Sequence, residues 1–210
     1  MKYVIMAGGS QAGFETPRHL LEFRGEPLLA RTVRLLHENG IKDIAVSSDN
    51  IEILEFARLN GIEGIIRNNI GQWIYAFPPS EDAVCYLFGD VVFSPKAINT
   101  IVKTKTLGIE FFASAPPFDR KLYPKRWAEP FAFKVVDTHR FASAIQDTHH
   151  LWKLYHAFKR EPIAWELWQV IKKTPINIID YTNYTVINDY TCDIDTPEDV
   201  EWWTSRRFVD

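Results

Sequence analysis

The chain contains little cysteine, no long hydrophobic run and no large excess of charge of either sign. Its two cysteines, Cys85 and Cys192, fit no metal-binding spacing, and Cys85 lies in an apolar run where a small core residue is expected. Free thiols of this kind are typical of a reducing compartment. A net charge of −3 gives no bulk attraction for nucleic acid, so we expect no nucleic-acid partner.

No apolar run reaches the length that spans a bilayer. The chain opens into a strand and a glycine loop rather than a signal peptide, so we expect a cytoplasmic protein with no membrane partner. Aromatic residues are in excess, with 7 Trp in 210 residues. We interpret most of these rings as core or oligomer contacts, which allows a homodimer, with a ligand-stacking platform as the alternative.

The remaining composition is that of an ordinary globular protein, with 46% hydrophobic and 24% charged residues, long enough for one α/β domain. Apolar runs predict strands at residues 3–6, 44–47, 62–67, 84–88, 110–115, 130–136, 176–179 and 184–187. Periodicity and boundary residues predict helices at 27–38, 51–60, 95–104, 149–173 and 197–206. This alternation predicts an α/β fold with a single open, mixed but mainly parallel sheet and helices on both faces.

Ligands of an open α/β sheet bind beyond the carboxyl ends of its strands, and three motifs fall at such ends. The first is the loop from Gly8 to Gly13, directly after the first strand. Its bare backbone N–H groups can approach a phosphate. The loop lacks both the Lys-Ser/Thr ending of a P-loop and the glycine spacing of a dinucleotide fold.

The other two motifs carry carboxylates. A buried strand ends at Gly89-Asp90, where the aspartate either ligates a divalent ion or serves a turn. Near the C-terminus, Asp193 and Asp195 alternate onto one side of an extended segment. Thr196 is expected to cap the helix that follows, with Glu198 and Asp199 as favourable charges of its first turn.

These motifs share their order with a known family. The segments Ala7-Gly8-Gly9, Pro17-Arg18, Gly25-Glu26-Pro27-Leu28 and residues 193–199 resemble the signature of the nucleotidyltransferases with the glycosyltransferase-A-like fold, sugar-phosphate nucleotidyltransferases and molybdenum-cofactor guanylyltransferases among them. The resemblance implies Mg²⁺, which Mn²⁺ can replace, bound by Asp90 and Asp195. It also implies that Arg18 binds the triphosphate, at a position where the family usually has lysine. Nucleotide contacts are implied for Ala7, Gly8, Gly9, Ser10, Gln11 and Gly89.

The sequence gives weaker indications of the nucleotide base and of the acceptor. The family contacts the base from the segment before the Gly-Asp strand, which here contains Gln72, and a Gln amide can pair with a pyrimidine edge. CTP or UTP is therefore favoured, with a surface glutamine as the alternative. A phosphorylated acceptor is expected from the basic loop before the strand at 130–136, or else that loop is merely solvated. Its candidate residues are Arg120, Lys121, Lys125, Arg126 and Glu129.

Three histidines on one predicted helix, His149, His150 and His156, lack a carboxylate or cysteine at metal-binding spacing. We favour helix-surface or acceptor-contact roles for them over a metal.

The implied organisation is one domain, 1–210, with a nucleotide-binding half (1–105), an acceptor-binding half (106–190) and a metal-site segment with the terminal helix (191–210). The implied reaction joins a nucleoside triphosphate to a phosphorylated acceptor such as a sugar phosphate and releases pyrophosphate. One alternative is a glycosyltransferase, although Asp90 is followed by Val91-Val92 rather than by a second aspartate. Another is an inactive nucleotide-binding regulatory module, because the glycine loop lacks the usual cation.

Overall fold

The protein is described from a computed structural model, which covers residues 1–8, 13–67, 73–119, 125, 127–155 and 160–205. Its main strands are β1 (Lys2–Met6), β4 (Ile44–Ser48), β5 (Glu63–Ile66), β6 (Val84–Phe88), β8 (Ile109–Ser114), β9 (Pro130–Val135) and β10 (Thr185–Ile187). Four two-residue strands are β2 (Glu22–Phe23), β3 (Glu26–Pro27), β7 (Val91–Val92) and β11 (Cys192–Asp193). The helices are α1 (Leu28–Glu38), α2 (Ile51–Leu59), α3 (Pro95–Lys103), α4 (Thr138–Tyr155), α5 (Ala164–Lys172) and α6 (Pro197–Thr204), with 3-10 turns η1 (Arg18–Leu20) and η2 (Trp73–Tyr75).

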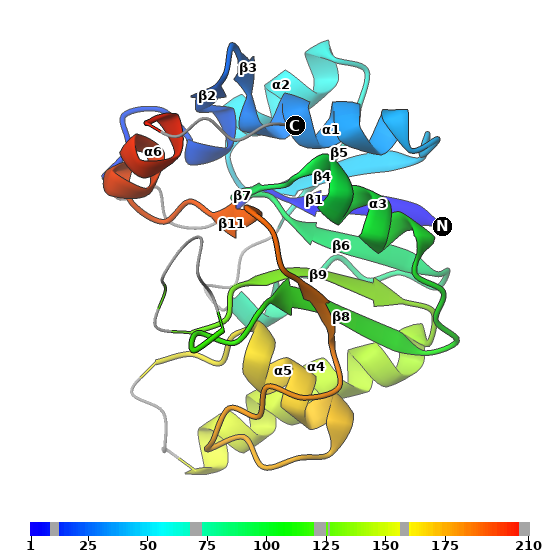
Figure 1. Ribbon diagram of the computed structural model, residues 1–210. Helices are drawn as coiled ribbons and strands as arrows, with labels where there is room; N and C mark the ends of the chain where they lie inside the picture. Colours follow the sequence, from blue (N-terminus) through cyan, green and yellow to red (C-terminus); the bar gives the residue numbers. More distant parts are fainter. Residues whose placement is uncertain (9–12, 68–72, 120–124, 126, 156–159, 206–210) are drawn as a thin grey trace.

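The seven main strands form one sheet in the order β10-β8-β9-β6-β1-β4-β5 (Figure 1). The pairs β1–β4, β1–β6, β4–β5 and β10–β8 are parallel, and β9 is antiparallel to both of its neighbours. The expected mixed, mainly parallel sheet is therefore confirmed. The chain leaves β1 toward β4 and β5 and later returns to β6 on the other side, so the strand order reverses at β1 and β6. A reversal of this kind opens a crevice at the carboxyl ends of the two strands.

Helices cover both faces of this sheet, as the alternation of side chains along β9 shows. Phe133 packs against Phe141 of α4, whereas the ammonium group of the next residue, Lys134, donates to the backbone carbonyls of Ile101 and Val102 in α3. Successive strand residues point to opposite faces, so α4 and α3 lie on opposite sides. α5 packs on α4, and α1 contacts α3, which gives each face a helical layer (Figure 1).

The core confirms several local expectations. Cys85 is buried in the sheet and both cysteines are free. α1 and α2 end before Gly40 and Gly61, whose positive φ angles of 79° and 67° suit the residue after a helix. Of the tryptophans, Trp165, Trp168 and Trp203 are buried, as expected of core rings.

Some elements differ from the sequence expectation. The predicted strand at 176–179 is not formed. The helix predicted at 149–173 is instead two helices, of which α4 already begins at Thr138. Pro162 lies between them and cannot continue a helix, because it lacks an N–H. α5 then starts with its own cap, in which the Glu166 carboxylate accepts a hydrogen bond from the Ile163 N–H at 2.9 Å.

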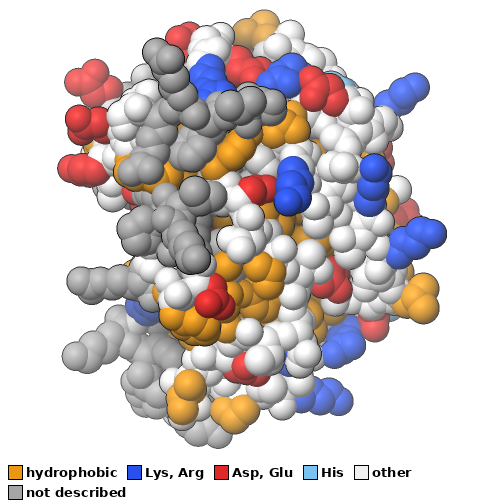
Figure 2. All heavy atoms as spheres, in the orientation of Figure 1, with side chains coloured by type: hydrophobic (Ala, Val, Ile, Leu, Met, Phe, Trp, Pro, Cys, Tyr) orange, Lys and Arg blue, Asp and Glu red, His pale blue; other side chains and the backbone are white. Residues whose placement is uncertain are grey.

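On the face drawn in Figure 2, charged side chains of neither sign form a large patch. Basic side chains stand apart from one another there, and hydrophobic side chains gather over β8, β9 and the start of α5. None of the helices in the described part of the chain combines the length and the apolar character needed to cross a bilayer.

Candidate active site

The site is built where β1 and β6 end side by side. Met6 of β1 pairs with Phe88 of β6 in parallel register. Gly89, the residue that follows β6, donates its N–H to the Met6 carbonyl at 3.0 Å. A Cβ on Gly89 would lie 2.7 Å from the Met6 carbonyl oxygen and 3.1 Å from the Cα of Ala7. Only glycine fits between these backbone atoms, and its small size brings the loops after both strands together.

Arg18 connects the two loops. One guanidinium nitrogen, Nη2, lies 2.8 Å from Oδ2 of Asp90, and the other, Nη1, lies 3.5 Å from Oδ1 of Asp195 and 3.2 Å from the carbonyl oxygen of Ile194. Its neighbour His19 is fully buried, which anchors the η1 turn beneath it. Three sequence-predicted residues, Arg18, Asp90 and Asp195, thus converge at one point.

Asp195 reaches this point through a short pairing that the sequence did not predict. β11 pairs antiparallel with β7, with Asp193 opposite Val91, and the Ile194 N–H donates to the Asp90 carbonyl at 2.8 Å. Burial of apolar side chains holds the segment in place. These side chains are Phe23, Leu28, Val92, Cys192, Ile194 and Trp203.

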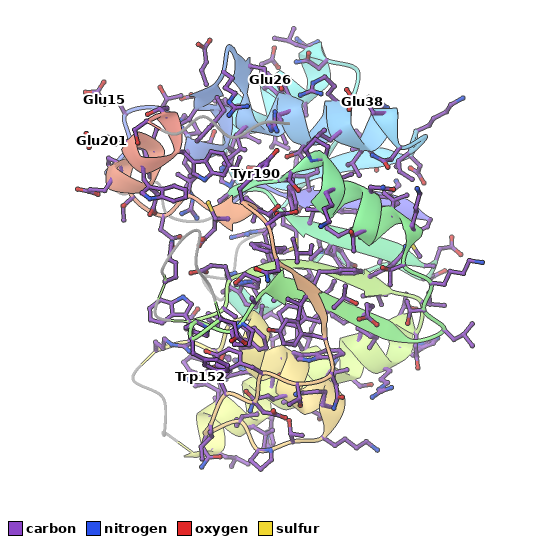
Figure 3. The ribbon with its side chains drawn as sticks, in the orientation of Figure 1. Glu15, Glu26, Glu38, Trp152, Tyr190 and Glu201 are labelled. Carbon is purple, nitrogen blue, oxygen red and sulfur yellow. The ribbon has the colours of Figure 1, made fainter. Side chains whose placement is uncertain are left out.

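Helix α6 fixes the end of the same segment. Thr196 accepts from the Asp199 N–H, and the Asp199 carboxylate accepts from the backbone N–H groups of Asp195 and Thr196, both at 2.9 Å. Asp199 is therefore more than the favourable first-turn charge expected from the sequence. In Figure 3, Tyr190 lies between α6 and α3, and its ring packs against Trp203 at 5.3 Å.

Lys125 comes from the loop between β8 and β9 and enters a cluster of carboxylates. Its Nζ lies 3.2 Å from Asp193 and from Asp195, 3.7 Å from Asp199 and 3.8 Å from Glu129. The shared distance places Asp193 and Asp195 on the same side of their segment, as their alternation indicated. Two of the predicted acceptor residues, Lys125 and Glu129, therefore border the same site as Asp195.

Crowding of charges changes the acidity of this cluster. Burial, together with the charges of Glu129 and Asp195, raises the pKa of Asp193 well above its ordinary value. Burial opposes ionisation of Asp195 as well, but a hydrogen bond with Asp193 and the charges of Lys125 and Arg18 outweigh it, so the pKa of Asp195 is lowered. Burial also raises the pKa of Asp90, against the opposing charge of Arg18.

The same groups include the donors that a divalent ion requires. Asp90 and Asp195 converge on a single cation, the guanidinium of Arg18, and their hard oxygen atoms are the donors that Mg²⁺ prefers. Within the described ranges, no set of three His, Cys, Asp or Glu side chains is arranged to hold a metal without help. A pair of carboxylates suffices where phosphate oxygens and water complete the coordination, so the residues fit Mg²⁺ bound together with a nucleotide.

Gly8, the first residue of the glycine loop after β1, lies against an ion pair that the sequence did not predict. A Cβ on Gly8 would come within 2.7 Å of Nη1 of Arg67 and 3.0 Å of Oδ1 of Asp49, which are themselves paired at 3.4 Å. These residues follow β5 and β4, so their position at strand ends was the available signal. Ala7 is buried, and its N–H donates to the Ser47 carbonyl at 2.8 Å. That N–H is therefore committed to the sheet rather than to a base.

Several sequence-predicted residues lie outside the described part of the chain. They are Gly9, Ser10, Gln11, Gln72, Arg120, Lys121, Arg126 and, among the histidines, His156. The ring of His149 packs against the rings of Tyr75 and Trp152, at centroid distances of 5.0 and 5.7 Å. These contacts are typical of a side chain that packs a helix against its neighbours. Trp152 is labelled on α4 in Figure 3.

A cavity of about 380 Å³ opens beside the converging charges. Arg18, Asp90 and Asp195 border it, as do Glu129 and Asp193. The rest of its lining is largely aromatic and aliphatic, including Trp73, Phe88, Trp127 and Trp165. The arrangement offers an apolar chamber with a strongly polar end, which is the general form of a small-molecule site.

No family model and no curated protein sequence matches the chain. Solved structures do match it over nearly its whole length. The inositol-1-phosphate CTP transferase from T. maritima aligns with a TM-score of 0.60 at 16% identity, covering 97% of this chain and 94% of the other. The chain has the fold of the sugar-phosphate nucleotidyltransferases.

Two further structures support this fold. One is a Bacillus anthracis protein described as a glucose-1-phosphate thymidylyltransferase, in complex with sucrose. It aligns with a TM-score of 0.60 at 15% identity, covering 100% of this chain and 97% of the other. The other is Rv0371c from Mycobacterium tuberculosis H37Rv, with a TM-score of 0.59 at 16% identity and coverage of 98% and 97%. Likeness at such low identity concerns the fold alone.

Proposed function

We propose that this protein is a nucleotidyltransferase. It would couple a nucleoside triphosphate to a phosphorylated small molecule. An acceptor phosphate oxygen attacks the α-phosphorus, a new P–O bond forms, the bond from the α-phosphorus to the bridging oxygen breaks, and pyrophosphate leaves. The observation that carries the proposal is the convergence of Arg18, Asp90 and Asp195 beside the phosphate loop, at the reversal of strand order.

The residues of the chain would act by placement and charge neutralisation. Backbone N–H groups of the loop that begins at Gly8 would hold the triphosphate. Arg18 would stabilise the negative charge that builds up on the phosphates, with its planar fork suited to two oxygens. No protein nucleophile is needed, because the acceptor brings its own oxyanion.

Asp90 and Asp195 would hold Mg²⁺, or Mn²⁺ in its place, with phosphate oxygens as further ligands. The ion would act there as a Lewis acid toward the phosphoryl oxygens. When nucleotide binds, Arg18 is the group placed to move its contacts from these carboxylates to phosphate.

A pyrimidine triphosphate, CTP or UTP, is the nucleotide that we propose. Gln72, which precedes β6 in the sequence, is the side chain that we assign to the base. The Arg67–Asp49 pair lies against Gly8, where it can supply both donors and acceptors. The T. maritima protein of similar fold is described as a CTP transferase, which accords with this assignment.

Pyrophosphate release tests the proposal. The protein would be incubated with Mg²⁺, each of the four common nucleoside triphosphates in turn, and a panel of phosphorylated acceptors. Release that requires both one pyrimidine triphosphate and one acceptor is the expected result. Triphosphate binding, seen as a thermal shift, with no release in any combination would instead identify a nucleotide-binding regulatory module.

A further inference from the structure

The described lining of the cavity beside the charged groups offers few hydrogen-bonding side chains to a polyhydroxylated molecule. None of its described lining residues is a Ser, Thr, Asn or Gln. Away from Arg18 and the aspartates, its walls are mainly Trp73, Phe88, Trp127, Trp165 and aliphatic side chains. Hydroxyl groups that lose water without gaining partners are costly to bury, so such walls disfavour an acceptor that carries many of them.

Aromatic faces form much of the wall. The rings of Trp73 and Phe88 lie 5.9 Å apart with an interplanar angle of 31°, and both residues line the cavity. Trp127 is 46% exposed, so its ring is accessible to a ligand. Indole faces carry negative potential and attract cations that approach within about 6 Å.

Among the described residues that line the cavity, acidic side chains outnumber basic ones. Glu129 and Asp193 are almost fully buried, and the single ammonium of Lys125 is shared among four carboxylates. The guanidinium of Arg160 is already bound to Glu166 at 2.8 Å. The excess of carboxylates among these described residues and the aromatic faces beside them both favour a positively charged ligand.

We propose that the acceptor is the phosphate monoester of an amino alcohol, with its ammonium group held by the rings of Trp73 and Trp127 and by the carboxylate of Glu129. This inference rests on the proposed nucleotidyl transfer and specifies its second substrate. The phosphate of the acceptor points to Arg18 and the nucleotide, and the alkylammonium end fills the aromatic chamber. The product is then a nucleoside diphosphate ester of the amino alcohol.

The test compares acceptors that differ in charge but not in shape. O-Phosphocholine and its uncharged carbon isostere, neohexyl phosphate, would be assayed for pyrophosphate release beside O-phosphoethanolamine and glucose-1-phosphate. We expect kcat/KM for phosphocholine or phosphoethanolamine to exceed that for neohexyl phosphate by at least about tenfold, the size of a desolvated cation–π contact. Equal rates with the isostere, or a preference for glucose-1-phosphate, would overturn the ammonium assignment while leaving nucleotidyl transfer in place.

Two variants test the named residues. Trp127→Ala is expected to raise KM for the ammonium acceptor about tenfold with kcat and the KM for nucleotide little changed, and Trp127→Phe to restore most of the affinity. Trp152→Ala is the matched control, because Trp152 is not among the described residues that line the cavity. An unchanged acceptor KM in Trp127→Ala would contradict the aromatic contact. Absence of pyrophosphate release with every acceptor would refute the proposed function itself, and this inference with it.

Discussion

The guanidinium of Arg18 and the carboxylate of Asp90 meet at 2.8 Å, although the two residues come from loops after different strands. Their side chains are only 15% and 23% exposed, so the pair lies within the protein rather than on its surface. Arg18 also reaches Asp195 at 3.5 Å and thereby gathers the three residues to which we assign triphosphate and metal binding.

Arg18 is predicted to bind phosphate through both its positive charge and the paired hydrogen bonds of its planar guanidinium group. Arg18→Gln removes the charge and is expected to lower kcat/KM for the nucleotide by about a hundredfold or more, the usual effect of losing a charge-stabilising group. Arg18→Lys keeps the charge and should retain activity within about tenfold, with the loss caused by the missing second hydrogen bond. Steady-state kinetics of both variants check this. Equal, small losses in the two variants would exclude a role in phosphate binding.

Asp90 is predicted to be required for turnover but not for folding. Asp90→Asn preserves shape and removes the negative charge, so we expect product formation to fall by about a thousandfold at saturating Mg²⁺. The control is Asp43→Asn, an exposed aspartate near the amino ends of the strands, 3.9 Å from Lys2. Circular dichroism and pyrophosphate release would be measured for both. Near-normal turnover in Asp90→Asn would show that Asp90 does not serve the metal.

Gly89 is predicted to tolerate no side chain. In Gly89→Ala the new methyl group meets backbone atoms of Met6 and Ala7 that cannot move cheaply, and we expect a loss of about 1–3 kcal/mol in unfolding free energy. Gly108→Ala is the matched control, because a Cβ added there would have no described atom within 4 Å beyond its chain neighbours. It should change the unfolding free energy by less than about 0.5 kcal/mol. Equal stabilities of the two variants in urea would show that the ends of β1 and β6 leave room for a methyl group.

His19 is predicted to make stability depend on pH. Burial, and secondarily the charge of Arg18, lowers the pKa of His19 to about 3. Both of its ring nitrogens are buried without a hydrogen-bond partner among the described residues. As the pH falls below 6.5, His19 becomes protonated in the unfolded chain but stays neutral in the folded protein. The unfolding free energy therefore falls as the pH falls. The slope approaches about 1.4 kcal/mol per pH unit between the two pKa values.

Urea titrations between about pH 4.5 and 7.5 measure this slope, since that window spans the onset of protonation in the unfolded chain. His19→Gln removes the titrating group, so its unfolding free energy should fall less steeply than that of the wild type, whatever its absolute value. His139→Gln is the control on an exposed histidine and should follow the wild type. Parallel curves for His19→Gln and the wild type would mean that His19 is protonated in the folded protein.

Local signals account for the parts of the fold that the sequence predicted. The apolar run at residues 84–88 indicates a buried strand, and the glycines after α1 and α2 indicate helix ends. These elements are present as expected. The helix from residue 138 and the break at Pro162 were missed because an aromatic-rich polar segment gives a weak periodic signal. The pairing of β7 with β11 joins two-residue strands distant in sequence, and no local pattern announces it.

The site divides in the same way. Arg18, Asp90 and Asp195 could be proposed because each stands in a segment that resembles the family's signature. The place of Lys125 among four carboxylates depends on contacts with residues about 70 positions later in the chain, so no local pattern joins it to Asp193. The Arg67–Asp49 pair against Gly8 was missed because each residue is an ordinary charge after a strand.

Transfer of a radioactive label shows whether the protein moves a nucleotidyl group to an acceptor. The protein would be incubated with Mg²⁺, a phosphorylated acceptor and CTP or UTP carrying a radioactive α-phosphorus, and the products separated by chromatography. We expect the label to move into a nucleotidylated acceptor, with one pyrophosphate released for each product formed, and Asp90→Asn to form both products about a thousandfold more slowly. Label that remains in the triphosphate, or that appears only as free nucleoside monophosphate, would contradict nucleotidyl transfer.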